Sequence, residues 1–213
     1  MRAYLIRHGQ TAWNVIGRAQ GHTDTPLDDV GLAQAAAVAR AFEGVEIGEI
    51  LTSDLSRARV TAEAIAARTG AVCRATPSLR ERSFGEWEGM PYEELRNLLR
   101  DRAHQAGLDE FEAAPPGGES LRDVWGRLDA VCERLASSTS PLVVVTHGGT
   151  CGLLVARLIH ATVMTSRSLR FGNTAITELH RRPDGFWVID RFADTTHLDT
   201  PSAPMIDSHV ASR

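Results

Sequence analysis

The sequence predicts an α/β protein with three layers, in which helices cover both faces of a mostly parallel central sheet. Short apolar runs repeatedly lead into helical patterns, and this alternation is typical of parallel sheets. The run "LVVVTHGG" at residues 142–149 is rich in β-branched side chains, as are strands that a parallel sheet buries on both faces. With 213 residues the chain is long enough for one substantial core, so residues 1–213 are expected to form a single domain.

Three strands and two helices are predicted in the first part of the chain. A polar loop follows the apolar run "AYLI", and an alanine-rich helix then ends at Gly44. The run "GEILTS" indicates a second strand, and the helix after it closes at Gly70 as its C-terminal cap. The predicted strands are 3–6, 48–53 and 71–75, and the predicted helices are 31–44 and 55–70.

The later part of the chain predicts two helices and three strands. Residues 118–137 are expected to form one helix, because their apolar side chains recur every three or four positions and make one stripe. The strand at 142–149 leads into a helix at 150–160, and a turn at 183–185 joins two strands within 175–192. The stripe consists of Leu121, Val124, Trp125, Leu128, Val131, Cys132 and Leu135.

Residues 84–118 interrupt this alternation of strands and helices. They are rich in glycine and proline around one short helix near 92–101. An insertion of this length in a compact domain is often a lid or a binding loop, and a lid is expected here. The polar, weakly patterned tail from about residue 194 is expected to be partly mobile.

The composition excludes several classes of function. The formal net charge of -4 argues against a nucleic-acid-binding protein, which usually carries a basic excess. No apolar run approaches the roughly 20 residues that a membrane span requires, and the N-terminus lacks the features of a signal peptide. Cys73, Cys132 and Cys151 form no close pair, so neither a disulfide framework nor a zinc site is indicated. We therefore expect a cytoplasmic protein without nucleic-acid or membrane partners.

Reactive side chains follow four of the predicted strands. Ligands of open α/β sheets bind beyond the carboxyl ends of the strands, so these side chains are expected to converge on one edge. Helix N-termini at the same edge add unpaired amide donors and positive dipole ends, which favour an anion. The pattern predicts a pocket that fits a phosphate. The segments are Arg7-His8-Gly9, Ser53 to Arg59, Arg80-Glu81-Arg82 and His147-Gly148-Gly149.

Each of these residues taken alone has an ordinary structural interpretation. His8 is then a histidine at a strand end, Arg57 a solvated helix residue and Glu81 a surface charge. The functional interpretation is favoured because the segments of His8 and His147 follow two separate strands of the same predicted sheet.

Six segments of the chain resemble the histidine phosphatase superfamily, the group with the phosphoglycerate mutase-like fold. They occur in the order of that family and span nearly the full length of the chain. "RHG" alone is a weak signal, whereas six ordered segments are specific. The branch that the chain resembles is that of the broad-specificity phosphatases. The segments are "LIRHGQTAWN", "GRAQGHTDTPLDDVGLAQA", "SDLSRARVTAEAI", "LRERSFGEWEG", "PPGGESL" and "VVVTHGG".

The resemblance implies a role for each matched residue. His8 would be the nucleophile that takes up the phosphoryl group, and Glu81 would give a proton to the leaving group. Arg82, if it points inward, would favour a substrate with a second anionic group. The catalytic candidates are His8, Glu81, His147, Arg7 and Arg57, and the candidate binding residues are Arg7, His8, Asn14, Gln20, Gly21, Arg57, Glu81, Arg82, His147 and Gly148.

The expected chemistry places a requirement on His8. Attack on phosphorus needs a neutral imidazole nitrogen whose lone pair is in line with the leaving oxygen. The neighbouring cations are expected to lower the pKa of His8 and so to keep it neutral. Arg7, Arg57 and His147 would balance charge on the phosphate oxygens, so neither a metal nor an organic cofactor is expected.

The resemblance leaves three functions open. Hydrolysis of a small phosphorylated metabolite through a phosphohistidine is preferred, because "LRERSFGEWEGMPYEEL" is similar to the phosphatase branch and differs from the "RHYGxLxG"-like stretch of cofactor-dependent mutases. Mutase-type transfer and a non-catalytic phosphate-binding role are the alternatives. Phosphoglycerate-type acids, glucosyl-phosphoglycerate, sugar phosphates and nucleoside-type esters such as α-ribazole phosphate are all open as substrates. A homodimer is an open possibility as well.

Overall fold

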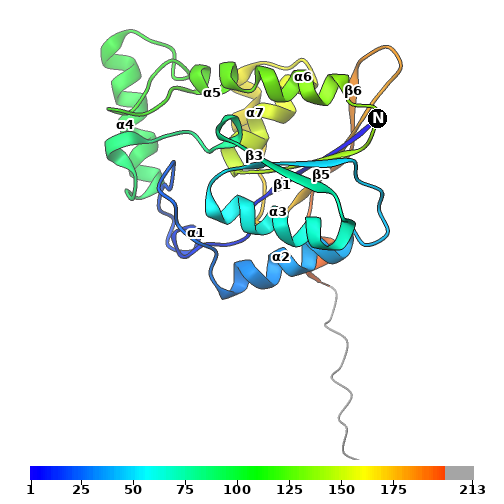
Figure 1. Ribbon diagram of the computed structural model, residues 1–213. Helices are drawn as coiled ribbons and strands as arrows, with labels where there is room; N and C mark the ends of the chain where they lie inside the picture. Colours follow the sequence, from blue (N-terminus) through cyan, green and yellow to red (C-terminus); the bar gives the residue numbers. More distant parts are fainter. Residues whose placement is uncertain (200–213) are drawn as a thin grey trace, which may run out of the picture.

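The computed structural model describes residues 1–199, and its centre is one sheet of six strands in the order β3-β2-β4-β1-β5-β6 (Figure 1). Strands β1 to β4 are parallel, whereas β5 is antiparallel to β1 and β6 is antiparallel to β5. The predicted mostly parallel α/β sheet is therefore confirmed. The strands are β1 (Arg2–Arg7), β2 (Glu49–Ser53), β3 (Val72–Thr76), β4 (Leu142–Thr146), β5 (Ile176–Arg181) and β6 (Trp187–Asp194).

The central strands bury both of their faces because side chains alternate across a strand. In β1, Leu5 belongs to the apolar core on one face of the sheet and Ile6 to the core on the other face. In β4, Val144 and Val145 divide between the two cores in the same way. Every residue of β2 and β4 is buried, as expected for strands inside a parallel sheet.

Helices cover both faces of the sheet and complete three layers (Figure 1). The pair α2 and α3 contributes to the core on one face, and α5, α6 and α7 contribute to the core on the other. Gly70 ends α3 in the left-handed conformation, with φ of 71°, as the sequence predicts. Among residues 1–199, no helix is long and apolar enough to cross a membrane. The helices are α2 (Asp29–Ala41), α3 (Ser56–Thr69), α5 (Leu121–Arg127), α6 (Asp129–Ser137) and α7 (Gly148–Leu158).

The prediction of a single helix at 118–137 is wrong, because the segment forms two helices that meet at Leu128. At this junction the Arg157 side chain of α7 donates a hydrogen bond to the carbonyl of Trp125. A side chain that bonds to a helix carbonyl disturbs the hydrogen bonds along the helix and can break it. The predicted apolar stripe nevertheless continues across the junction, since Val124 and Val131 belong to the same core.

Two boundaries near the sheet edge also differ from the prediction. The strand predicted at 142–149 ends at Thr146, and α7 begins at Gly148, earlier than the predicted residue 150. His147 lies between them as the N-cap of α7, in an extended conformation. A further short helix, α1 (Ala12–Val15), forms in the loop after β1 and is opened by Thr11.

The insertion at 84–118 extends from one end of the sheet and carries α4 (Tyr92–Ala106) (Figure 1). This helix runs beyond the predicted 92–101, and its apolar contacts continue to the buried Ala103. A small apolar cluster joins the insertion to the loop after α1. Its buried members are Ala19, Phe84 and Leu95, and the short helix η2 (Gly85–Trp87) lies beside it.

The tail predicted from about residue 194 is partly ordered. Strand β6 runs to Asp194, and a single turn, η4 (Thr196–Leu198), follows it. The rest of the predicted tail, 200–213, lies outside the described residues. Two further short helices, η1 (Pro77–Leu79) and η3 (Val163–Ser168), follow β3 and α7.

Candidate active site

The two predicted histidines lie side by side at the carboxyl edge of the sheet. Arg7 of β1 pairs with Thr146 of β4, and each strand is followed directly by a histidine. The rings of His8 and His147 are both buried, and their centroids lie 5.1 Å apart. The His8 amide donates to the Thr146 carbonyl at 2.9 Å, which extends the pairing of the strands by one residue. Two adjacent parallel strands thus bring together residues that are far apart in the sequence.

The tautomer of His8 is fixed by a backbone carbonyl. Its Nδ1 lies 2.6 Å from the Gly9 carbonyl oxygen, which can only accept, so Nδ1 carries the proton and Nε2 carries the lone pair. Burial, followed by the charges of Arg7 and Arg57, holds the pKa of His8 well below its ordinary value. The pKa of His8 is therefore lowered as expected, but burial contributes more to this shift than the neighbouring cations that the sequence indicated.

Arg57 is a fully buried guanidinium in the first turn of α3. It donates from Nη1 to the Thr23 carbonyl at 2.9 Å and from Nη2 to the Gly21 carbonyl at 2.8 Å. Its Nε donates to Nδ1 of His147 at 3.2 Å. Burial lowers the pKa of Arg57 to about 10, so it remains a cation at neutral pH.

His147 is held from both sides of its ring. Because Nδ1 accepts from Arg57, Nε2 carries the proton in the neutral ring and donates to the Ser53 hydroxyl at 2.9 Å. Burial, Arg57 and His8 keep the pKa of His147 well below its ordinary value. Ser53 lies at the end of β2 and is itself buried.

Arg7 is the second cation of the site. Its Nη1 donates to the Phe171 carbonyl at 2.7 Å, whereas its buried Nε has no hydrogen-bond partner among residues 1–199. Burial lowers the pKa of Arg7, and the charge of Glu81 opposes this effect. A buried donor without a partner is rare in folded proteins and is the kind of group that a bound anion satisfies.

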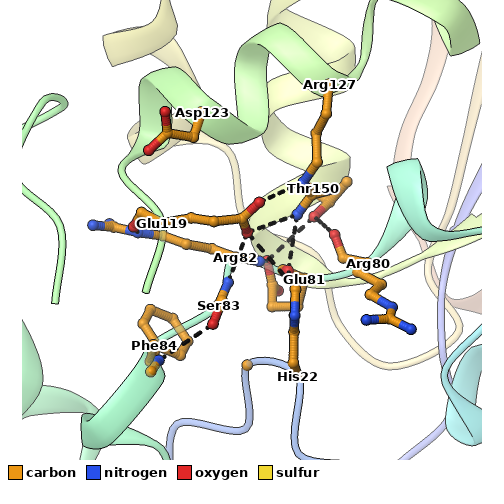
Figure 2. Close-up of polar contacts among 12 residues, drawn as sticks. His22, Arg80, Glu81, Arg82, Ser83, Phe84, Glu119, Asp123, Arg127 and Thr150 are labelled. Atoms are coloured by element: carbon orange, nitrogen blue, oxygen red, sulfur yellow. Dashed lines mark hydrogen bonds and ion pairs between the residues drawn. The ribbon is translucent and has the colours of Figure 1, made fainter. Parts of the chain in front are cut away.

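Glu81 reaches the site from the loop after η1. Its Oε2 accepts the Gly149 amide at 3.0 Å, and its Oε1 accepts the Arg82 amide at 2.9 Å and the Thr150 hydroxyl at 3.3 Å (Figure 2). A Cβ on Gly149 would lie 2.7 Å from Oε1 of Glu81. The start of α7 therefore fixes the carboxylate, and only glycine leaves it room.

Three further predicted residues lie next to these groups. Asn14 accepts through Oδ1 from the Thr11 amide at 3.0 Å and from the Asn173 side chain at 3.3 Å. Gln20 is buried, and its Oε1 has no partner within the described part of the chain. Gly21 contributes its carbonyl to Arg57.

Arg82 and Gly148 also line the cavity, but in different ways. Arg82 donates from Nε to the Glu119 carbonyl at 2.6 Å and from Nη2 to the Ala113 carbonyl at 2.7 Å. These hydrogen bonds hold the C-terminal end of the insertion in place. Recognition of a second anionic group by Arg82 stays a prediction. Gly148 is the first residue of α7, where the backbone amides point out of the helix end.

The side chains surround a cavity of about 740 Å³ between the sheet edge and the insertion. All ten predicted binding residues except Gly21 line it. The lining also includes apolar side chains and further arginines, among them Trp13, Phe84, Tyr92, Phe171, Arg96 and Arg170. Within residues 1–199, no group of three or more His, Cys, Asp or Glu side chains is placed to hold a metal ion.

Three residues that support the site were missed by the sequence interpretation. Glu88 accepts from the amides of His22 and Thr23, both at 2.8 Å. It thereby connects the insertion to the loop whose carbonyls bind Arg57. Glu119 and Arg127 form an ion pair at 2.9 Å next to Glu81. Glu88 and Glu119 lie inside the matched segments "GEWEG" and "GGES", which is the one signal that could have found them.

Fold and site together define an α/β protein with a histidine- and arginine-lined cavity at the carboxyl edge of its sheet. Residues 3–195 match the profile of the histidine phosphatase superfamily (branch 1). The chain belongs to this family.

Similar proteins carry the names of both phosphatases and a mutase. The protein named "Probable phosphoglycerate mutase GpmB" from Yersinia pestis (strain Pestoides F) is 33% identical over 209 residues, covering 95% of this chain and 97% of its own. The solved structure of mycobacterial glucosyl-3-phosphoglycerate phosphatase with VO3 has a TM-score of 0.80 and 33% identity, covering 91% of this chain and 99% of that chain. The α-ribazole phosphatase from Shigella flexneri has a TM-score of 0.80 and 27% identity, covering 91% of this chain and 96% of that chain.

Proposed function

We propose that this protein is a phosphomonoesterase that transfers the phosphoryl group of a small metabolite to His8 and then to water. The observation that carries the proposal is the state of His8. The ring is buried and neutral, its Nδ1 proton is bound to the Gly9 carbonyl, and the lone pair is left on Nε2. A neutral nitrogen held in one orientation is what in-line attack on phosphorus requires.

In the first step, Nε2 of His8 forms a bond to phosphorus while the bond from phosphorus to the ester oxygen breaks. The leaving alkoxide is a strong base, so it takes a proton from the Glu81 carboxyl group as it departs. The ester oxygen leaves as an alcohol, and Glu81 becomes a carboxylate. The phosphoryl group remains on His8.

Fixed positive groups balance the charge that spreads over the phosphate oxygens in this step. Arg57 is held by two carbonyls and cannot swing away. Arg7 has one buried Nε–H without a partner in residues 1–199, and a phosphate oxygen would satisfy it. The backbone amide of Gly148, at the positive end of α7, adds a further donor.

In the second step, the Glu81 carboxylate removes a proton from a water molecule, which attacks phosphorus. The bond from phosphorus to Nε2 breaks, and inorganic phosphate leaves. His8 returns to its neutral form and Glu81 to its protonated form, so the cycle closes with one water consumed.

The cavity supports a substrate larger than phosphate itself. A volume of about 740 Å³, with aromatic and arginine side chains in its lining, fits a metabolite of sugar-phosphate or nucleoside-phosphate size. A second candidate function is phosphoglycerate mutase activity, which the name of the Yersinia relative favours. In a mutase the phosphohistidine returns its phosphoryl group to a second hydroxyl and water is excluded.

The two functions are separated by one screen. A panel of phosphomonoesters, including 3-phosphoglycerate, glucosyl-3-phosphoglycerate and α-ribazole phosphate, is assayed for released phosphate, and 3-phosphoglycerate is assayed in parallel for isomerisation. Released phosphate without isomerisation supports the phosphatase. Isomerisation without released phosphate supports the mutase and contradicts the proposed phosphomonoesterase activity.

Substitution of the nucleophile separates an enzyme from a phosphate-binding protein. His8→Ala is expected to lose turnover by roughly three orders of magnitude or more while retaining its fold, measured by circular dichroism. A folded His8→Ala protein that hydrolyses an aryl phosphate at the original rate would contradict the assignment of the nucleophile.

A further inference from the structure

A second group of charged residues, Arg127 and Glu119, lies beside Glu81 (Figure 2) and does not line the cavity. Arg127, the last residue of α5, donates from Nη2 to the Glu81 carbonyl at 2.9 Å and from Nη1 to the Ser78 carbonyl at 2.7 Å. The same guanidinium donates from Nε to one oxygen of Glu119 at 2.9 Å and from Nη2 to the other at 3.1 Å. Every nitrogen of Arg127 therefore has a partner.

Glu119 connects this arginine to the chain just after Glu81. Its Oε2 accepts the Ser83 amide at 2.9 Å, and its own amide donates to the Ser83 carbonyl at 2.9 Å. Burial acts to raise the pKa of Glu119, but the hydrogen bonds from Arg127 and Ser83 outweigh it, and the pKa is lowered. Glu119 is thus a carboxylate at neutral pH, paired with a guanidinium of similar burial.

Both the main chain and the side chain of Glu81 are consequently held in place. Its carbonyl accepts from Arg127 and, at 2.9 Å, from Nε2 of His22, which approaches from the opposite side in Figure 2. Its carboxylate is held separately by the start of α7. Because a carboxyl group on a three-bond side chain follows its own backbone, the main chain of Glu81 has to be fixed before the acid can be aimed.

We propose that Arg127 and Glu119 form a clamp that positions Glu81 for proton transfer to the leaving group. The proposal rests on the proposed function, in which Glu81 is the proton donor. Neither residue of the clamp touches the substrate, so both are positioning residues. Their loss should impair the step that needs the acid and spare a step that does not.

The leaving group of the ester distinguishes this role from a general structural one. A nitrophenolate ion is weakly basic and departs without a proton, whereas an alkoxide needs one. The value of kcat/KM reports the steps through the first phosphoryl transfer and is therefore measured for 4-nitrophenyl phosphate and for an alkyl ester such as glycerol phosphate. The variants are Arg127→Gln, Arg127→Lys and Glu119→Gln, with Glu81→Gln as the reference.

For Arg127→Gln, we expect kcat/KM for the alkyl ester to fall by roughly 10- to 100-fold, and that for the aryl ester by less than about threefold. Glu119→Gln should show the same selectivity to a smaller degree. Arg127→Lys keeps the cation but cannot reach all of the partners, so it provides the test if Arg127→Gln does not fold. Arg122→Gln, on the same helix but paired with Glu112 outside the clamp, should leave the ratio of the two kcat/KM values unchanged.

Two unfavourable outcomes are distinguishable. In the first, Glu81→Gln selectively lowers kcat/KM for the alkyl ester, but folded variants of Arg127 and Glu119 lower kcat/KM for both esters equally or not at all. The proposed clamp is then wrong, and the assignment of Glu81 as proton donor stands. In the second, Glu81→Gln itself lowers kcat/KM for both esters equally. The assignment of Glu81 as proton donor is then wrong, and so is the clamp that depends on it.

Discussion

His8 and His147 are buried and neutral, although each histidine would titrate near neutral pH in an unfolded chain. Burial is the larger cause for both rings, and Arg57 adds to it. The neutral form suits a nucleophile, since a protonated imidazole has no lone pair. The same arrangement makes the folded state unable to take up protons that the unfolded chain accepts.

We therefore expect the free energy of unfolding to decrease as the pH falls below about 6.5. Below that pH the unfolded chain binds a proton at each of the two positions and the folded chain does not, so acid favours unfolding. The contribution approaches about 1.4 kcal/mol per pH unit for each histidine. Denaturant unfolding at about pH 7.5 and about pH 5.5 measures it, and His8→Asn should reduce the slope. The same slope in His8→Asn as in the unsubstituted protein would contradict the expectation.

Gly149 gives a second prediction for a single residue. Its Cβ in Gly149→Ala would lie 2.7 Å from Oε1 of Glu81, so the carboxylate must move. We expect kcat/KM for an alkyl ester to fall by roughly tenfold or more, with little loss of stability because a side chain can yield. Gly126→Ala is the matched control, because nothing lies within 4 Å of the added Cβ. It should keep its activity and gain up to about 1 kcal/mol of stability. Full activity in Gly149→Ala would mean that the position of Glu81 does not matter.

Among the elements, the loop at 20–23 binds the buried guanidinium of Arg57. Its carbonyls hold Arg57, and its amides are held in turn by the Glu88 carboxylate of the insertion. Glu88 also accepts the Phe84 amide at 3.2 Å. The insertion therefore supports the cavity through this loop and also contributes to its lining.

Substitution of Glu88 by glutamine should weaken this support. Hydrogen bonds to a charged acceptor contribute about 1.5–3 kcal/mol each, and Glu88→Gln removes the charge from several of them. We expect a loss of stability of a few kcal/mol at most and a lower kcat/KM for aryl and alkyl esters alike, since Arg57 serves both. Thermal unfolding and the two-ester assay measure these effects. A selective loss with the alkyl ester would instead connect Glu88 to the proton donor.

The elements differ in how far the sequence could predict them. Strands β1 and β4 were predictable because apolar runs with polar ends mark buried strands, and their ends located His8 and His147. The break at Leu128 was not predictable, because it coincides with a contact from Arg157 on another helix. The clamp of Arg127 and Glu119 was missed for the same reason: its bonds join α5 to a loop about 40 residues earlier, and no periodicity reports such a contact.

For the molecule as a whole, the net charge of -4 and the charge of the pocket have opposite signs. At the site Arg57 is fully buried and Arg7 is half-buried. A buried cation acts on a bound anion with little screening by salt. Under the proposed function, this local positive charge attracts a phosphate although the net charge of the chain is negative.

This distribution leads to a prediction about metal removal. Because Arg7, Arg57 and the start of α7 already supply positive charge around the phosphate, we expect hydrolysis to continue at the same rate after treatment with a chelator. Activity is compared before and after dialysis against EDTA, and again after Mg²⁺ is added back. A loss on dialysis that Mg²⁺ restores would show that the arginines are insufficient.

The pairing of β1 with β4 has a consequence for synthesis on the ribosome. Strand β1, which directly precedes His8, is made first, but its parallel neighbour β4 emerges only about 140 residues later. A nascent chain that stops before His147 lacks this histidine and the start of α7, and so cannot assemble the pocket. Truncated products of translation should therefore be inert toward phosphate esters, whatever part of the N-terminal half has folded.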